Sequence, residues 1–466
     1  MARHASSRRT FLKKSAAISL GFTGLQSFFW KGCEESSTAV MKKVNLPYGP
    51  ILSDPKGMLR LPEGFTYKII SQVGDVMTDG LFTPGLPDGM ATFDGGNGKT
   101  IVIRNHELIS KDFGAFGEKN ELLSHVPNDK IYDIGSPAVR CKGGTTTFIY
   151  DEKTGKVESS WLSLAGTIRN CAGGVTPWGS WITCEETFVN VSKNLKKRHG
   201  FNFEVPATMT PSMAAPIPLK AMGRFNHEAV CVDPVTNIVY QTEDRNDSSI
   251  YRFLPNEKGN LKAGGKLQAL VIKAQKTIDT RNWKSDVMPI KKRLEVEWLD
   301  LDNVNPTTDT LRYRAQKSGA AIFARGEGMW FGSGEVYFAC TSGGRKKYGQ
   351  VFRYVPSAYE GTDREKEQPA TIELFLEPND KELLQYCDNL TIAPWGDIIM
   401  CEDRARPNIV GVTPQGEMYR VAENIGVPSE FAGGVFSPSG KTFFVNIQHA
   451  GMTLAITGPW NRMGNS

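Results

Sequence analysis

The feature that most constrains this chain is a stretch of sequence, residues 170–186, that returns in altered form at residues 387–403. Each stretch contains a cysteine near its start, a Pro-Trp-Gly turn in its middle and two adjacent acids at its end. A long internal echo of this kind is typical of folds built from repeated units. We therefore expect the chain to repeat one structural unit several times.

Further segments follow the same plan of a polar residue, a strand, a turn and a second strand, often with another polar group after it. They begin at Asp88, His227, Glu327 and Glu430. Short runs of β-branched and aromatic residues, as at 145–150, are separated by Gly, Pro, Asn or Asp, whereas helical periodicity is scarce. Together these hairpins predict an all-β chain folded as a six-bladed β-propeller, with two packed β domains as the alternative.

The predicted organisation of the chain has three parts. They are a signal segment at 1–33, an extended lead-in at 34–60 and a single propeller domain at 61–466. Within the propeller, the less regular stretches are expected to be loops inserted between blades and covering the mouth of the central channel. These stretches are residues 111–137, 189–220 and 256–310.

The first residues are typical of an export signal. Arg8 and Arg9 precede Phe11, and an apolar stretch at 16–30 follows that is too short for a stable membrane anchor. The arginine pair favours the twin-arginine export machinery as a partner, and a generic basic leader is the alternative. We expect the protein to be periplasmic or secreted, with a possible lipid anchor at Cys33.

Composition is that of a soluble globular protein, with 40% hydrophobic and 23% charged residues. The net charge of +5 is modest, and no basic stripe interleaved with aromatic residues suggests binding to nucleic acid. The eight cysteines contain no Cys-x-x-Cys pair, which argues against a zinc ribbon or a thioredoxin-like motif. We expect a monomer.

Polar residues recur at equivalent ends of the repeats, where radial repetition would bring them to one axis. The candidates are Asn105, Glu107, Cys171, Glu185, Glu186, Glu228, Glu243, Asp244, Glu327, Asp388, Glu402 and Asp403. So many carboxylates would repel one another and raise one another's pKa unless cations neutralised them. Oxygen-rich ligation favours calcium or ferric iron, and one thiolate adds a soft ligand.

Each candidate also has a purely structural interpretation. Paired acids often lie in solvated turns, and a lone cysteine such as Cys171 is often a small buried residue. His106 and His227 would be metal ligands or hydrogen-bonding core residues. Arg325 would hold an anionic substrate or neutralise the acids. The repetition of the acids in registered units favours the metal interpretation.

Several motifs together resemble the PhoX-type alkaline phosphatase family. They are Leu61-Pro62-Glu63-Gly64-Phe65, Asn105-His106-Glu107, the stretch 171–186, Asn226-His227-Glu228-Ala229, Glu327-Gly328 and the stretch 388–403. The resemblance implies an exported six-bladed propeller with a central iron–calcium cluster. It also implies iron ligation by Cys171, Glu228 and Glu327, and a phosphate contact by Arg325. The calcium side would use Asp388, Glu402 and either Glu185 or Glu186.

The function expected from this resemblance is hydrolysis of small phosphomonoesters. A metal-bridging oxo or hydroxo group would attack phosphorus, while the metals stabilise the leaving alkoxide. The alternatives are a calcium-dependent propeller phosphodiesterase or lactonase, and a non-catalytic propeller that is braced by calcium. Which of Glu185 and Glu186 faces the channel stays open at this stage.

Overall fold

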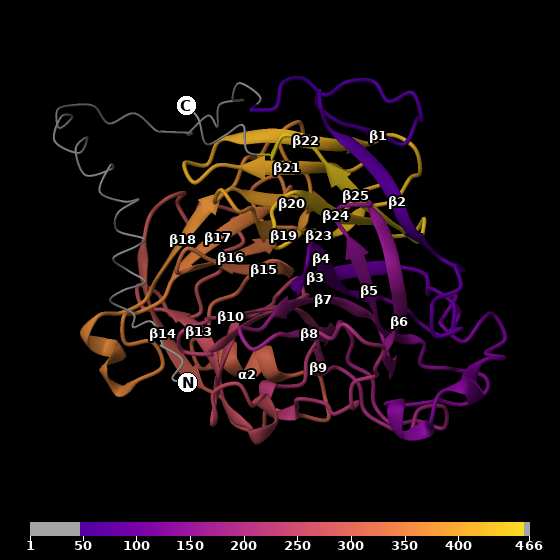
Figure 1. Cartoon of the computed structure of the whole chain (residues 1–466). Helices are drawn as coiled ribbons and strands as arrows, with labels where there is room; N and C mark the ends of the chain where they lie inside the picture. The colour runs from indigo at the N-terminus through magenta and orange to yellow at the C-terminus, as the bar shows by residue number, and fades with distance from the viewer. Residues whose placement is uncertain (1–46, 461–466) are drawn as a thin grey trace, which may run out of the picture. The chain divides into compact units, whose positions relative to one another are not determined.

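A computed structural model describes residues 47–460 of the chain (Figure 1). The predicted signal segment, Cys33 and the lead-in as far as residue 46 therefore lie outside the described residues. Residues 47–460 belong to one compact unit, and strands dominate them. None of the helices described in this range is long and apolar enough to cross a lipid bilayer.

Two sheets are antiparallel meanders that follow chain order. The first contains β3 (Pro87–Gly96), β4 (Lys99–His106), β5 (Gly143–Asp151) and β6 (Lys156–Thr167). The second contains β7 (Asn170–Val175), β8 (Ser180–Glu185) and β9 (Asn202–Pro206). Gly179, at φ +84°, completes the Pro-Trp-Gly turn between β7 and β8, because glycine accepts this backbone conformation without steric cost.

A nine-stranded sheet follows in the chain and consists of two meanders joined by one strand. The first meander is β10 (His227–Val232), β11 (Val239–Glu243), β12 (Tyr251–Pro255) and β13 (Gly265–Ile272). The second is β15 (Gly326–Gly332), β16 (Glu335–Cys340), β17 (Gln350–Val355) and β18 (Thr371–Leu376). The joining strand, β14 (Leu294–Asp300), pairs with both β13 and β18.

The last two sheets are completed by strands from the beginning of the described chain. One contains β19 (Cys387–Ile392), β20 (Ile398–Glu402), β21 (Asn408–Val412), β22 (Met418–Asn424) and β1 (Leu59–Arg60). The other contains β23 (Phe431–Phe436), β24 (Thr442–Ile447), β25 (Met452–Thr457) and β2 (Thr66–Gln72). These pairings bind the two ends of the described chain into the fold.

The first strands of these meanders contact one another in a closed order. β3 contacts β7, β7 contacts β10, β10 contacts β15, β15 contacts β19, β19 contacts β23, and β23 contacts β3 again. The labels of these strands gather at the middle of Figure 1. The arrangement is therefore all-β and propeller-like. Within the described residues it has four separate sheets and one nine-stranded sheet, in place of the six separate blades that the sequence predicted.

Two of the three predicted loops contain strands, so those predictions were wrong. Residues 256–310 include β13 and β14, and residues 189–220 include β9. In β14 the apolar residues Leu294, Val296 and Trp298 alternate with acids, which is the pattern of a strand with one packed face.

Helical elements are short in the described chain. The 3-10 turns η1 (Leu123–His125) and η2 (Asn128–Lys130) lie in residues 111–137, and the others are η3 (Lys220–Met222), η4 (Leu261–Ala263) and η5 (Asp363–Glu367). The α-helix α2 (Leu311–Lys317) precedes β15.

Apolar side chains fill the spaces within and between the sheets. Phe323 packs edge-on against Phe338 and Phe352 in the region of the nine-stranded sheet. Cys184 and Cys401, which strand alternation assigns to the packed face, are both fully buried.

Candidate metal centre

A cavity of about 200 Å³ lies where the first strands of the meanders meet, and its lining is almost entirely charged. Among residues 47–460, nine carboxylic acids and two arginines line it. The lining residues are Asp88, Glu107, Arg169, Cys171, Glu186, Glu228, Asp244, Arg325, Glu327, Asp388, Asp403, Glu430 and Gln448. We call this cavity the central pocket.

Bulges at the start of the first strands present one set of these side chains. The pairing of β10 with β11 shifts register between His227 and Val230, which leaves Glu228 within the bulge. Register shifts at the same place in β3, β7, β15 and β19 surround Asp88, Cys171, Glu327 and Asp388. A bulge redirects side chains and is common beside active sites. The repeats therefore deliver five potential ligands through one local device.

The second strands supply the other set of lining residues. The residue immediately after each strand faces the central pocket in β4, β8, β11, β20 and β24. These residues are Glu107, Glu186, Asp244, Asp403 and Gln448. In each pair of adjacent acids, the second acid thus lines the pocket and the first does not.

The first acid in the pairs 185–186 and 402–403 instead binds backbone amides of neighbouring connections. Glu185 accepts hydrogen bonds from the backbone of Ile168, Gly200 and Phe201 at 3.0, 2.8 and 3.2 Å. Glu402 accepts from the amides of Gln385 and Asn408, each at 2.8 Å. Within the described chain, Glu185, Glu243 and Glu402 do not line the central pocket.

Asn105 also turns away from the central pocket. Its amide donates to the carbonyls of Cys171 and Ala172 at 2.9 and 2.8 Å, and it accepts from the Trp181 ring nitrogen at 2.8 Å. Asn105 therefore braces the backbone that carries Cys171. His106 and His227 are fully buried and do not line the pocket, and burial lowers the pKa of both.

Burial makes the electrostatics of the central pocket unfavourable without added positive charge. Burial, followed by neighbouring carboxylates, raises the pKa of Asp88, Glu228 and Glu327 well above the usual range. The same two causes raise the pKa of the Cys171 thiol. Both carboxylate oxygens of Glu228 are buried, and neither has a hydrogen-bond partner within the described part of the chain.

The potential ligands form a connected series of groups. Within each group, one ligand atom per residue lies within 4.8 Å of the others. The groups are Asp88–Glu107–Cys171, Cys171–Glu186–Glu228, Glu228–Glu327–Asp388 and Asp388–Asp403–Glu430. Because consecutive groups share Cys171, Glu228 or Asp388, the residues fit several adjacent cations better than one.

Two arginines reach the central pocket from equivalent positions. Arg169 immediately precedes β7 and contacts Glu107 at 2.6 Å and Glu186. Arg325 immediately precedes β15 and contacts Asp244 at 2.7 Å and Glu327 at 2.8 Å. Both have positive φ, +52° and +50°, which is uncommon for a residue with a side chain and often marks functional sites.

Residues 46–451 match the family described as Alkaline phosphatase PhoX. The chain belongs to this family. Membership confirms the resemblance drawn from the sequence and supports a phosphatase activity. It also implies metal cofactors, which the donor set of the central pocket fits.

The comparisons with curated proteins and with solved structures add no further support for a function. A search of curated proteins found no match. Among solved structures, a gluconolactonase from Xanthomonas campestris is 8% identical, with 84% of this chain and 98% of that chain covered and a TM-score of 0.39. A luciferin-regenerating enzyme is 11% identical, with 85% and 96% covered and a TM-score of 0.36.

Four lining residues escaped the sequence predictions, although repeat position could have found them. Asp88 heads its repeat as Asp388 does, and Gln448 follows β24 as Glu107 follows β4. Arg169 precedes β7 as Arg325 precedes β15. Glu430 departs from the repeat position of the other acids, because it lies immediately before its strand, β23, and not within a bulge. The register shift in β23, between Ala432 and Val435, also begins one residue further into the strand than in the other first strands.

Proposed function

We propose that this chain is an exported, metal-dependent phosphatase that hydrolyses phosphomonoesters at the central pocket. Glu228 carries the proposal. Both of its oxygens are buried without a hydrogen-bond partner in the described chain, and the charged groups around it are other acids. A buried carboxylate without a partner is costly, and bound cations would supply the missing interactions. Family membership supports a phosphate ester as the substrate.

The ligands divide by chemistry. Following the family resemblance, Cys171, Glu228 and Glu327 are proposed to bind ferric iron, and Glu228 belongs to a ligand group with each of the other two. Glu186 and Asp388, which belong to those two adjacent groups, are proposed to bind calcium with other oxygens. Bound metal ions would activate water and neutralise the phosphate oxygens. The placement of the side chains favours Glu186 over Glu185, and Asp403 over Glu402, as members of this set.

Arg325 and Arg169 are proposed to hold the phosphate group from two sides. Burial alone would lower the pKa of Arg325, but Glu327 and Asp244 raise it far above the usual range, so the side chain stays charged. Cations on those acids would free guanidinium donors, and a guanidinium binds phosphate oxygens in bidentate fashion. The lining of the central pocket in the described chain includes neither serine nor histidine, which disfavours a Ser–His mechanism.

The same ring of first strands supports a count of six blades. Each half of the nine-stranded sheet contributes one first strand, β10 or β15, to the closed order of contacts. We infer that the two halves act as separate blades that β14 joins at their outer strands. This places one pocket-lining segment per blade around the centre.

The test is metal analysis and turnover of p-nitrophenyl phosphate by the mature protein, with and without chelator. We expect bound iron and calcium, and loss of turnover on chelation. Cys171→Ala should lose iron and lower kcat/KM by at least about 100-fold. Cys184→Ala is the matched control, because Cys184 is buried in β8 but does not line the central pocket.

Other outcomes point to other functions. Absence of both iron and calcium, or equal rates in all samples, would reject the proposal. Calcium without iron, with hydrolysis of a lactone or a phosphodiester, would indicate one of the rival hydrolases. Bound metal without hydrolysis of any ester would indicate a binding propeller.

A further inference from the structure

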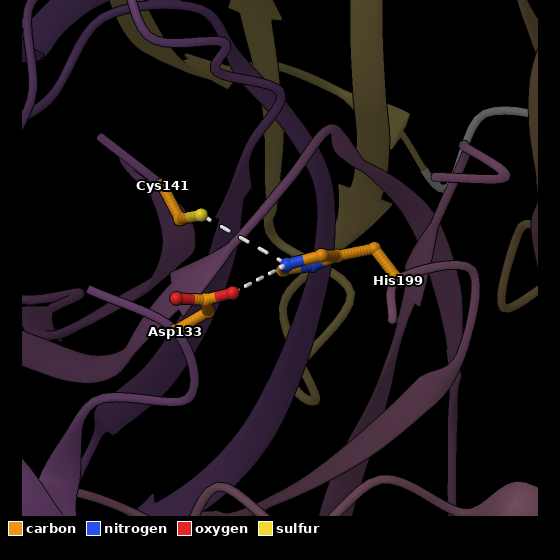
Figure 2. Close-up of side chains that lie close together, drawn as sticks. All are labelled: Asp133, Cys141 and His199. Carbon is orange, nitrogen blue, oxygen red and sulfur yellow. Dashed lines mark hydrogen bonds and ion pairs between the residues drawn. The ribbon is translucent and has the colours of Figure 1, made fainter. Parts of the chain in front are cut away.

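A second cluster of potential metal ligands lies outside the central pocket, in the connections that follow β4 and β8. Asp133 and Cys141 belong to the connection between β4 and β5, and His199 to that between β8 and β9. Their exposed fractions are 2, 4 and 0%. Figure 2 shows the Asp133 carboxylate and the Cys141 sulfur directed at the imidazole of His199.

The Asp133–His199 distance suits a shared metal ion better than a direct hydrogen bond, and the Cys141–His199 distance is that of a long sulfur hydrogen bond or of two ligands of one ion. Asp133 Oδ2 lies 3.6 Å, and Cys141 Sγ 3.8 Å, from the same atom, His199 Nε2. An N–H···O hydrogen bond spans about 2.7–3.2 Å. Around tetrahedral zinc, bond lengths of about 2.0–2.3 Å place neighbouring ligand atoms about 3.3–3.6 Å apart. The observed separations are close to these ligand–ligand distances.

The other imidazole nitrogen is held in the way that metal-binding histidines require. His199 Nδ1 lies 2.6 Å from Glu185 Oε1, and the His199 carbonyl accepts from Arg224 Nε at 2.8 Å. A carboxylate on one nitrogen fixes the tautomer and leaves the other lone pair for the metal. Tyr132 packs edge-on against the ring at 5.3 Å. The orientation of His199 is thus set before any ion binds.

Two buried carboxylates in and beside the cluster, Asp133 and Glu185, must be balanced by positive charge, from a protonated His199 or from a bound cation. Asp133 and Glu185 are both fully buried, and buried carboxylates are stable only when paired or bound to metal. Backbone amides of Gly135, Lys196 and Lys197 donate to Asp133 at 2.8 Å each, which supplies partial charge only. A protonated His199 could also provide the charge, so the experiment must separate an imidazolium from a bound ion.

We propose that Asp133, Cys141 and His199 bind one zinc ion, or a divalent cation of similar softness, separate from the central pocket. Mixed sulfur, nitrogen and oxygen ligation is typical of zinc, whereas the pocket is rich in oxygen. Binding ionises the thiol and releases its proton to solvent. The ion would join the β4–β5 and β8–β9 connections, and through His199 and its partner Glu185 it would hold the backbone beside the pocket acid Glu186.

The experiment uses cobalt as a spectroscopic substitute for zinc in the full mature chain. The parent is Cys171→Ala, which removes the thiol of the central pocket. After dialysis against chelator, Co²⁺ is titrated while thiolate-to-cobalt charge-transfer absorption is followed in the near ultraviolet, and Zn²⁺ is then added. Cys141→Ser and, as matched control, Cys231→Ser are each added to the parent, since Cys231 is a buried free thiol in β10.

We expect the thiolate band to correspond to about one equivalent of cobalt in the parent and in the Cys231→Ser protein, and zinc to displace it. Cobalt on the carboxylates of the central pocket gives no thiolate band. Cys141→Ser should remove the band and weaken binding at least tenfold. No band in the parent, or an equal band after Cys141→Ser, would overturn the proposal. A protonated His199 would then be the group that balances the buried carboxylates. If Cys141→Ser fails to fold, the parent decides the question. Alkylation during native-state opening is timed with and without zinc, and zinc must slow it at Cys141 more than at the buried Cys231. Equal slowing at the two cysteines, or none at Cys141, overturns the site.

Discussion

At the scale of single residues, Glu228 and Glu243 show how one residue type serves two purposes. Both are fully buried, in the adjacent strands β10 and β11. Glu243 accepts from the Tyr251 hydroxyl at 2.9 Å and pairs with Arg312 at 3.4 Å, whereas Glu228 has no hydrogen-bond partner. Burial raises the pKa of Glu243 to about 7, although Arg312 opposes the rise. A carboxylate with partners holds structure, and one without them is available for a cation.

This contrast gives a prediction for the two Glu→Gln variants. Glu228→Gln should lose bound metal and most phosphatase activity, yet leave the metal-free protein as stable or more stable at pH 8. The substitution removes a buried acid that folding must either protonate or hold charged among other carboxylates. Glu243→Gln should keep its metal and lose about 1–3 kcal/mol of unfolding free energy. Metal analysis and urea unfolding in chelator check both. A Glu228→Gln protein that retains its full metal content would contradict the assignment.

The choice between Glu185 and Glu186 shows where sequence reasoning stops at this scale. Sequence identifies the acidic pair and its repeat position. It does not reveal that β8 ends at Glu185, or that the amides of Ile168 and Gly200 meet that carboxylate. Those partners come from two different connections, so the decision is made by tertiary structure.

At the scale of elements, neighbouring first strands approach so closely that only glycine fits between them. A Cβ on Gly328 of β15 would lie 2.6 Å from Leu390 N and 2.7 Å from Asp388 O of β19. A Cβ on Gly89 of β3 would lie 2.7 Å from Ala172 Cα of β7. Each glycine follows a pocket acid, so the close approach also brings the acids of adjacent strands together.

We predict that Gly328→Ala separates β15 from β19 and disturbs the metal site between them. Gly334 is the control, because it lies in the β15–β16 turn at φ +83° with open space around it. Both alanines should destabilise the fold by about 1–3 kcal/mol, one by overpacking and the other by backbone strain. Only Gly328→Ala should also lower metal content and kcat/KM. Equal loss of metal in both variants would contradict the role of the close approach.

The elements differ in how readily sequence reveals them. Turn residues and β-branched runs made the hairpins predictable, as at β5 and β12. The bulges were not predictable, because one extra residue at Cys171 or Glu327 barely disturbs the alternation along the strand. The strand β14 was readable from its alternation, but its pairing with two meanders depends on a neighbour more than 70 residues away, β18.

At the scale of the whole molecule, the closed order of first strands gathers acids that the unfolded chain keeps far apart. Burial, then Asp403, raises the pKa of Asp388 to about 7, although Arg325 opposes the rise. Burial, then Asp403 and Asp388, raises the pKa of Glu430 to about 11. In the unfolded chain such acids titrate near pH 4. The metal-free folded protein therefore holds protons that the unfolded chain has already released.

The sign of the pH dependence follows from this difference. Between about pH 4 and the raised pKa of each acid, the folded state binds more protons, so the unfolding free energy of metal-free protein falls as pH rises. Each such acid contributes up to about 1.4 kcal/mol per pH unit. Bound cations require ionised carboxylates and compete with protons, so loaded protein should instead gain stability as pH rises. The two profiles should diverge from pH 5 to pH 8.

Urea unfolding at pH 5, 6, 7 and 8 tests this prediction, with excess calcium and iron in one series and chelator in the other. The loaded protein should become more stable relative to the metal-free protein at every step. Glu430→Gln should flatten the metal-free profile, because it removes a buried acid whose pKa is raised. Parallel profiles in the two series would mean that cations do not replace protons on this ring of acids, and that the acids are neutralised by protons in the working protein.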